Sequence, residues 1–190
     1  LSSMRADTIA VLDELKVDRV HIIGFPMGGI LAIDLGGNAP ERLETITAIS
    51  VSQNPDGMIP AIAEMNCEPG SAPPPEARDL MPTEEDFARM QAGFAVNPDD
   101  SEQFQRTLTS LQAFMTSDWG WSEKELSSIE APTLIVVGHN DFIPVKHAPR
   151  MASMIDAELT VLPDTTHMSF INRADWLALL IENRIGTAIN

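Results

Sequence analysis

The sequence predicts an α/β fold in which a parallel sheet is flanked by helices and carries a helical cap insertion. Short apolar runs alternate with helical segments, the pattern of parallel strands joined by right-handed crossovers. One run, Thr133–Gly138, is continuously apolar and is typical of a strand buried on both faces. A long stretch without a strand pattern precedes it. We therefore assign residues 1–52 and 131–190 to the core, and residues 53–130 to a helical cap or lid, called the insertion below.

The first part of the core contains two predicted helices and two predicted strands. Apolar residues at helical spacing predict an amphipathic helix over residues 4–16, and a strand follows at Val20–Gly24. The next helix runs from about Met27 to Leu35 and stops at a glycine pair, with Pro40 just beyond. Residues 43–51 are rich in Ile, Thr and Val and predict a second strand.

The insertion begins with a proline-rich segment and continues with helical patterns. The prolines predict loops and short turns over residues 53–82, followed by helices at residues 84–93, 101–116 and 122–128. The rest of the core is predicted as a strand at 133–138, a helix at 144–155 broken or kinked near Pro149, a strand at 158–162 and a helix at 174–184.

Composition argues against several classes of partner. The 190 residues carry a formal net charge of -16, which would repel nucleic acid and anionic membrane surfaces. No apolar run approaches the roughly 20 residues that span a bilayer. Cys67 is the only cysteine, so neither an internal disulfide nor a cysteine metal cluster can form, and we expect a reducing cytoplasm. The glycines at 24, 28 and 29 do not match a dinucleotide-binding motif, and no cofactor or metal is expected.

The stretch Gly24-Phe25-Pro26-Met27-Gly28-Gly29 joins the first strand to the second helix through a sharp turn. A strand feeding a helix through Gly-x-x-x-Gly is the pattern of a nucleophile elbow, in which a central serine is lifted above the sheet. Here Pro26 stands at the central position. Proline has no hydroxyl and no backbone N–H, and it fixes φ near -65°, so we expect a relaxed turn.

Two further polar side chains follow the last two predicted strands. Asp141 comes after the strand at 133–138, and His167 comes after the strand at 158–162. In an open parallel sheet, functional groups gather beyond the carboxyl ends of the strands. The chain order is elbow, Asp, His, which is the order of a hydrolase triad on this kind of sheet.

These three motifs resemble those of the α/β-hydrolase family, and the chain is similar to the carboxyl-terminal two-thirds of its small bacterial esterase-like members with a helical cap. The resemblance rests on the elbow, on residues 132–141, and on Leu162-Pro163-Asp164-Thr165-Thr166-His167. It implies that position 26 belongs to the serine nucleophile, Asp141 to the triad acid and His167 to the general base. It also implies that the backbone N–H of Met27 is an oxyanion-hole donor.

Two functions remain open. The resemblance implies a carboxylic-ester hydrolase acting on a small apolar or ester-bearing molecule, but with Pro26 the chain as given is expected to be catalytically impaired. The alternative is a non-catalytic protein of the same fold that binds an apolar ligand or a protein partner. An Asp–His pair favours the first, because apolar ligand binding gives such a pair no role.

Four other side chains carry a thiol or hydroxyl that could in principle replace the missing one. Cys67 lies in the proline-rich segment with no histidine near it in sequence, and Ser169 follows His167 too closely. Ser50 and Ser52 end the second strand and could approach the site, although nothing in their local sequence activates them.

The first residue, Leu1, leads almost at once into the first helix, and we expect the chain to be a fragment or a processed product. The resemblance implies several strands before that helix. Without them the strand Val20–Gly24 would lie at an open apolar edge, which favours pairing with another chain. We therefore expect a protein partner, or a segment missing from this chain, to cover that edge.

Overall fold

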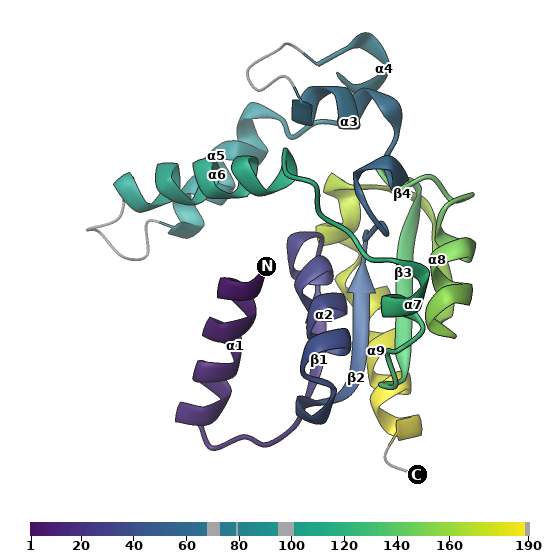
Figure 1. The fold of residues 1–190 in the computed structure, drawn as a ribbon. Helices are drawn as coiled ribbons and strands as arrows, with labels where there is room; N and C mark the ends of the chain where they lie inside the picture. Colours follow the sequence, from purple (N-terminus) through teal and green to yellow (C-terminus); the bar gives the residue numbers. More distant parts are fainter. Residues whose placement is uncertain (68–72, 79, 95–100, 189–190) are drawn as a thin grey trace.

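The computed structural model describes residues 1–67, 73–78, 80–94 and 101–188, and it has the predicted α/β architecture (Figure 1). Four parallel strands form one sheet in the order β1-β2-β3-β4. The strands are β1 (Val20–Gly24), β2 (Leu43–Ile49), β3 (Thr133–Asn140) and β4 (Glu158–Thr166). The predicted fold class is confirmed, and each of the four strands forms where an apolar run predicted one.

Strand register places all four carboxyl ends at the same edge of the sheet. Gly24 pairs with Ala48 of β2, Ile49 pairs with Val136 of β3, and Asn140 pairs with Thr166 of β4. The residues that follow the strands are therefore brought together although they are far apart in sequence. This edge carries the site described below.

Helices cover both faces of the sheet because successive side chains of a strand point to opposite faces. Ile135 and Val137 of β3 belong to the main core cluster with side chains of α2 (Met27–Asn38) and α8 (Ala148–Ile155). Leu134 and Val136 face the other way, toward α9 (Ala174–Ala188). Helix α1 (Ser2–Glu14) lies alongside α2 (Figure 1).

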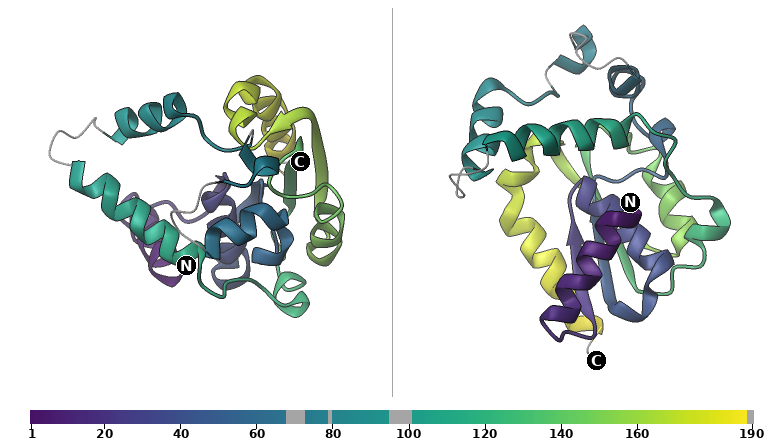
Figure 2. Two further views of the ribbon diagram at one scale, coloured as in Figure 1. Left: turned by 90° about the horizontal axis from the view of Figure 1, so that it is seen from above. Right: turned by 60° about the vertical axis from the view of Figure 1, so that its left-hand side comes forward.

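Most of the insertion lies beyond the carboxyl ends of the strands in the two side views (Figure 1, and Figure 2, right). Its helices are α3 (Pro60–Cys67), α4 (Pro75–Arg78), α5 (Glu84–Phe94), α6 (Ser101–Met115) and α7 (Glu123–Leu126). The prediction of only loops and short turns before residue 84 was wrong for α3 and α4. Both helices begin with a proline, which is tolerated in the first turn because its missing N–H would have no helical partner there. Residues 68–72 and 79 lie outside the described residues.

The last part of the insertion packs with the core instead. Leu126 of α7 is fully buried, and with Trp119 and Ile129 it joins the main core cluster. A capping box at Ser122, whose side chain accepts from the N–H of Glu125, starts this short helix. The division of the chain into a core and a cap stays a prediction.

Several predicted boundaries differ from the structure, and helix α2 runs through the predicted stop at Gly36 and Gly37 to Asn38. Helix α8 begins at Ala148, so Pro149 stands in its first turn and does not kink it. Strand β2 ends at Ile49 because Ser50 turns into the left-handed region, with φ 56°. Strand β4 and helix α9 extend four residues further than predicted, to Thr166 and Ala188.

β1 is an edge strand of the described sheet, and its Ile23 side chain is 48% exposed. Covering of this edge by a partner or another segment stays a prediction. Among the helices of the described residues, none has the length and apolar character that crossing a membrane requires.

Candidate active site

The turn between β1 and α2 is tight enough to require glycine at its start. A Cβ on Gly24 would lie 2.0 Å from the carbonyl carbon and oxygen of Gly28 and 2.4 Å from the nitrogen of Gly29. These are backbone atoms that cannot rotate away. The close approach of strand end to helix start is therefore retained, although the central residue is proline.

Pro26 precedes the first residue of α2 with φ -66° and ψ -42°, which are helical values. Its carbonyl accepts from the N–H of Ile30 at 3.0 Å, so the helix is continuous from this position. The φ of Pro26 lies in the range to which the proline ring restricts it, and the relaxed turn stays a prediction. Met27 opens the helix, and the N–H groups of a first turn lack helical acceptors, which makes this end favourable for negative charge.

Asp141 is held at the end of β3 by its own loop. A Cβ on Gly138 would lie 2.2 Å from the carbonyl oxygen of Thr165, so glycine allows β3 and β4 to approach there. The Asp141 carboxylate accepts from the N–H of Phe142 at 2.7 Å and from the N–H of Gly138 at 3.3 Å. The residue is only 5% exposed, and these donors offset the cost of burying its charge.

His167 lies opposite Asp141, at the end of β4. Its Nδ1 is 2.9 Å from Oδ1 of Asp141. The ring stacks on Phe142, with centroids 4.1 Å apart, and contacts the ring of Phe25 at 4.9 Å. Two aromatic rings and one carboxylate therefore restrict how the imidazole can rotate.

Ser50 also reaches this pair, and its contacts were not predicted. Its Oγ donates to Oδ1 of Asp141 at 2.9 Å and lies 2.9 Å from Nδ1 of His167. The sequence placed Ser50 near the site but gave it no role. The signal that could have identified it is strand order, because β2 lies between β1 and β3 and its end lies between Pro26 and Asp141.

A cavity of about 280 Å³ connects these residues to the insertion. Pro26, Met27, Ser50 and His167 line it from the strand ends. The described residues of the insertion that line it are all apolar: Met58, Ile62, Met81, Leu111 and Met115. Ser52, Ile30, Phe142 and Ile143 also line the wall. Among the described residues, the polar side-chain groups of this mainly apolar cavity are one imidazole and two hydroxyls.

A second histidine attaches the start of the insertion to the core. His147 Nε2 accepts from the N–H of Gln53 at 3.3 Å, and a Cβ on Gly57 would lie 2.6 Å from the same nitrogen. Burial lowers the pKa of His147 below its usual value of about 6.5, and the charge of Arg150 lowers it further. The neutral ring is the form that can accept this hydrogen bond.

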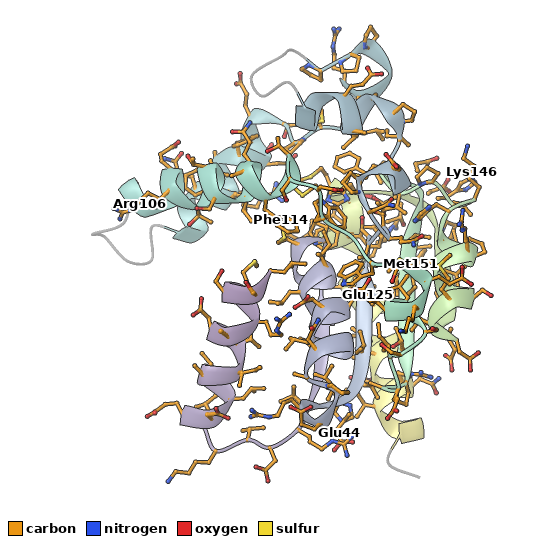
Figure 3. All side chains as sticks on the ribbon, in the orientation of Figure 1. Glu44, Arg106, Phe114, Glu125, Lys146 and Met151 are labelled. Atoms are coloured by element: carbon orange, nitrogen blue, oxygen red, sulfur yellow. The ribbon has the colours of Figure 1, made fainter. Side chains whose placement is uncertain are left out.

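Phe114 of α6 packs toward the core and stacks on Trp119, with ring centroids 5.6 Å apart (Figure 3). Because Trp119 belongs to the main core cluster, this contact joins the end of α6 to the core. Within the described ranges, no group of three or more His, Cys, Asp and Glu side chains is placed to hold a metal ion.

Comparison with known proteins gives a consistent picture. A family model described as the alpha/beta hydrolase family matches residues 2–179. The chain is 27% identical over 181 residues to a 2-hydroxy-6-oxo-6-phenylhexa-2,4-dienoate hydrolase of Burkholderia cepacia, covering 87% of the chain and 62% of that protein. It is 25% identical over 192 residues to a 2-hydroxymuconate semialdehyde hydrolase of Pseudomonas putida, covering 95% of the chain and 67% of that protein.

Among solved structures, a meta-cleavage product hydrolase from Pseudomonas fluorescens IP01 superposes with a TM-score of 0.71 at 22% identity. The superposition covers 95% of this chain and 70% of that one, and it supports the fold. The chain thus spans about two thirds of the length of the curated relatives described above.

Proposed function

Because the chain belongs to the alpha/beta hydrolase family, we propose that its site is that of a carboxylic-ester hydrolase working through a serine, an aspartate and a histidine. Asp141 is the triad acid, His167 is the general base, and position 26 is the nucleophile position. One observation carries this proposal: the buried Asp141–His167 pair, with Oδ1 and Nδ1 2.9 Å apart beside an apolar cavity. Binding of an apolar ligand alone would give this pair no role.

In that reaction, His167 takes the proton of a hydroxyl at position 26 while the oxygen attacks the ester carbonyl. Asp141 accepts a hydrogen bond from Nδ1 and stabilises the imidazolium that forms. The N–H of Met27, at the start of α2, donates to the developing oxyanion. His167 then gives the proton to the leaving alcohol, and water completes the cycle by the same route.

Pro26 prevents the first step, because the chain as given has no hydroxyl at that position. We therefore propose that acyl transfer by this chain is impaired at the nucleophile, while the acid and base are retained. The apolar lining favours an uncharged ester or another apolar acyl compound, since a buried charge would find few polar partners in the cavity.

The experiment that tests this proposal restores the hydroxyl. Pro26→Ser should hydrolyse p-nitrophenyl acetate at least about tenfold faster than Pro26→Ala, a matched control that restores the N–H without the hydroxyl. Adding His167→Ala to Pro26→Ser should remove the gain. Equal rates for the serine and alanine variants, or full activity without His167, would refute the proposed mechanism.

A second function is favoured by the cavity itself. Its wall combines side chains from the strand ends with five apolar side chains of the insertion, as in a pocket for a small apolar ligand. In this case the chain binds its ligand without converting it to a product. Thermal stabilisation of the natural chain by an uncharged apolar compound, together with equal ester hydrolysis by Pro26→Ser and Pro26→Ala, would favour this second function over the first.

A further inference from the structure

Three polar atoms form a closed triangle beside the cavity. Ser50 Oγ, Asp141 Oδ1 and His167 Nδ1 lie 2.9 Å apart along each of the three edges. All three residues are buried, with exposed fractions of 3%, 5% and 9%. Each hydrogen in this triangle must therefore be assigned to an acceptor within it.

The available protons allow one satisfactory assignment. An ionised carboxylate only accepts, so the O–H of Ser50 and the N–H at Nδ1 both donate to Asp141. The N–H at Nδ1 also points toward the Ser50 oxygen, which accepts it as the second acceptor of a bifurcated hydrogen bond and so satisfies the third edge. If Ser50 donated to Nδ1 instead, that nitrogen would have no proton, and two acceptors would face each other at 2.9 Å.

This assignment has two consequences. The proton is fixed on Nδ1, which leaves Nε2 of His167 as the nitrogen that can accept a proton. The Ser50 hydroxyl is directed at Asp141 and is not poised as a nucleophile, although Ser50 lines the cavity.

The backbone at Ser50 supports a specific role. Its φ of 56° lies in the left-handed region, which residues other than glycine, asparagine and aspartate adopt uncommonly. The Ser50 N–H donates to the carbonyl of Val136 at 2.8 Å, which ties this turn to β3. The turn ends β2 and holds Ser50 where its hydroxyl meets Asp141.

We propose that Ser50 is a positioning residue that fixes the tautomer and ring orientation of His167 through Asp141. The effect of this positioning on catalysis rests on the proposed function. Ser50 itself does not touch the reacting atoms. Its hydroxyl is a further support of the imidazole, besides the carboxylate and the rings of Phe142 and Phe25.

The first test uses the natural chain and requires no activity. In ¹⁵N NMR of the neutral imidazole, His167 should be almost entirely in the Nδ1–H tautomer, with a slowly exchanging Nδ1 proton. Ser50→Ala and Ser50→Gly should both give mixed tautomers and at least about tenfold faster exchange, because each lacks the hydroxyl. Glycine also removes the cost of the left-handed backbone. If either variant keeps the natural tautomer and exchange rate, the hydroxyl is not the support and the proposal is overturned.

The second test uses the Pro26→Ser background. There, Ser50→Ala and Ser50→Gly should each lower kcat about tenfold and change KM less than about twofold, because substrate contacts are retained while the base is misaligned. An unchanged kcat in both would overturn the proposal. Inactivity of Pro26→Ser itself, with the NMR result intact, would refute the proposed function and leave the role of Ser50 standing.

A labelling experiment needs no variant. The natural chain, treated with an alkyl fluorophosphonate and analysed by peptide mass spectrometry, should carry no adduct on Ser50. An adduct there would overturn the positioning role, because it would show that Ser50 acts as a nucleophile.

Discussion

The tight turn that precedes α2 can be tested by placing one methyl group on Gly24. In Gly24→Ala, the new Cβ would lie 2.0 Å from the carbonyl carbon and oxygen of Gly28. Ordinary contact begins at 3.4 Å, so strand end and helix start must separate by about 1.4 Å. Since backbone atoms cannot rotate aside, the cost should reach the upper end of overpacking, about 3 kcal/mol or more in the free energy of unfolding.

Gly28→Ala is the matched control, four residues further along the same segment. A Cβ on Gly28 meets nothing within 4 Å, and alanine is favoured over glycine in a helix by about 0.5–1 kcal/mol. Urea unfolding followed by tryptophan fluorescence and circular dichroism should therefore separate the two variants by about 4 kcal/mol. A loss of less than about 1 kcal/mol in Gly24→Ala, or equal midpoints for the two variants, would refute this account of the turn.

Two further predictions concern the insertion and the cavity. Burial lowers the pKa of His147, so the folded state favours its neutral form more than the unfolded state does. The free energy of unfolding should therefore be highest above about pH 6.5 and should fall as the pH is lowered, because protonation then favours the unfolded state. The melting temperature should therefore drop between pH 7.5 and 5.5 by more in the natural chain than in His147→Gln, whose amide oxygen can still accept from Gln53. The same drop in both would show that His147 does not carry the effect. For the cavity, methyl octanoate should raise the melting temperature of the natural chain, whereas sodium octanoate at equal concentration should raise it less, because the lining is mainly apolar. Equal shifts, or no shift with either compound, would count against an uncharged apolar ligand.

The sequence by itself determined the fold class and the family. Apolar runs such as Thr133–Gly138 predicted parallel strands, and Gly24-x-x-x-Gly28 predicted the sharp turn, in which the structure requires glycine at position 24 but leaves room for a Cβ at position 28. These signals are local, so periodicity and glycine spacing can reveal them. Asp141 and His167 were named because each follows a strand, and the structure brings them within hydrogen-bonding distance. Their catalytic roles, and that of Met27, stay predictions.

Only the tertiary structure decided which side chains surround that pair. Ser50 is 91 residues from Asp141 and 117 from His167 in sequence, and only strand register brings the three together. Nothing in the local sequence distinguished Phe25 and Phe142 from other apolar residues, and the structure places both rings against His167. The prolines that predicted loops proved to start α3 and α4. These starts, at Pro60 and Pro75, are a local signal instead, because proline is tolerated in the first turn of a helix. For Ser50, Phe25 and Phe142 the outcome depends on contacts between distant segments, which local sequence patterns do not encode.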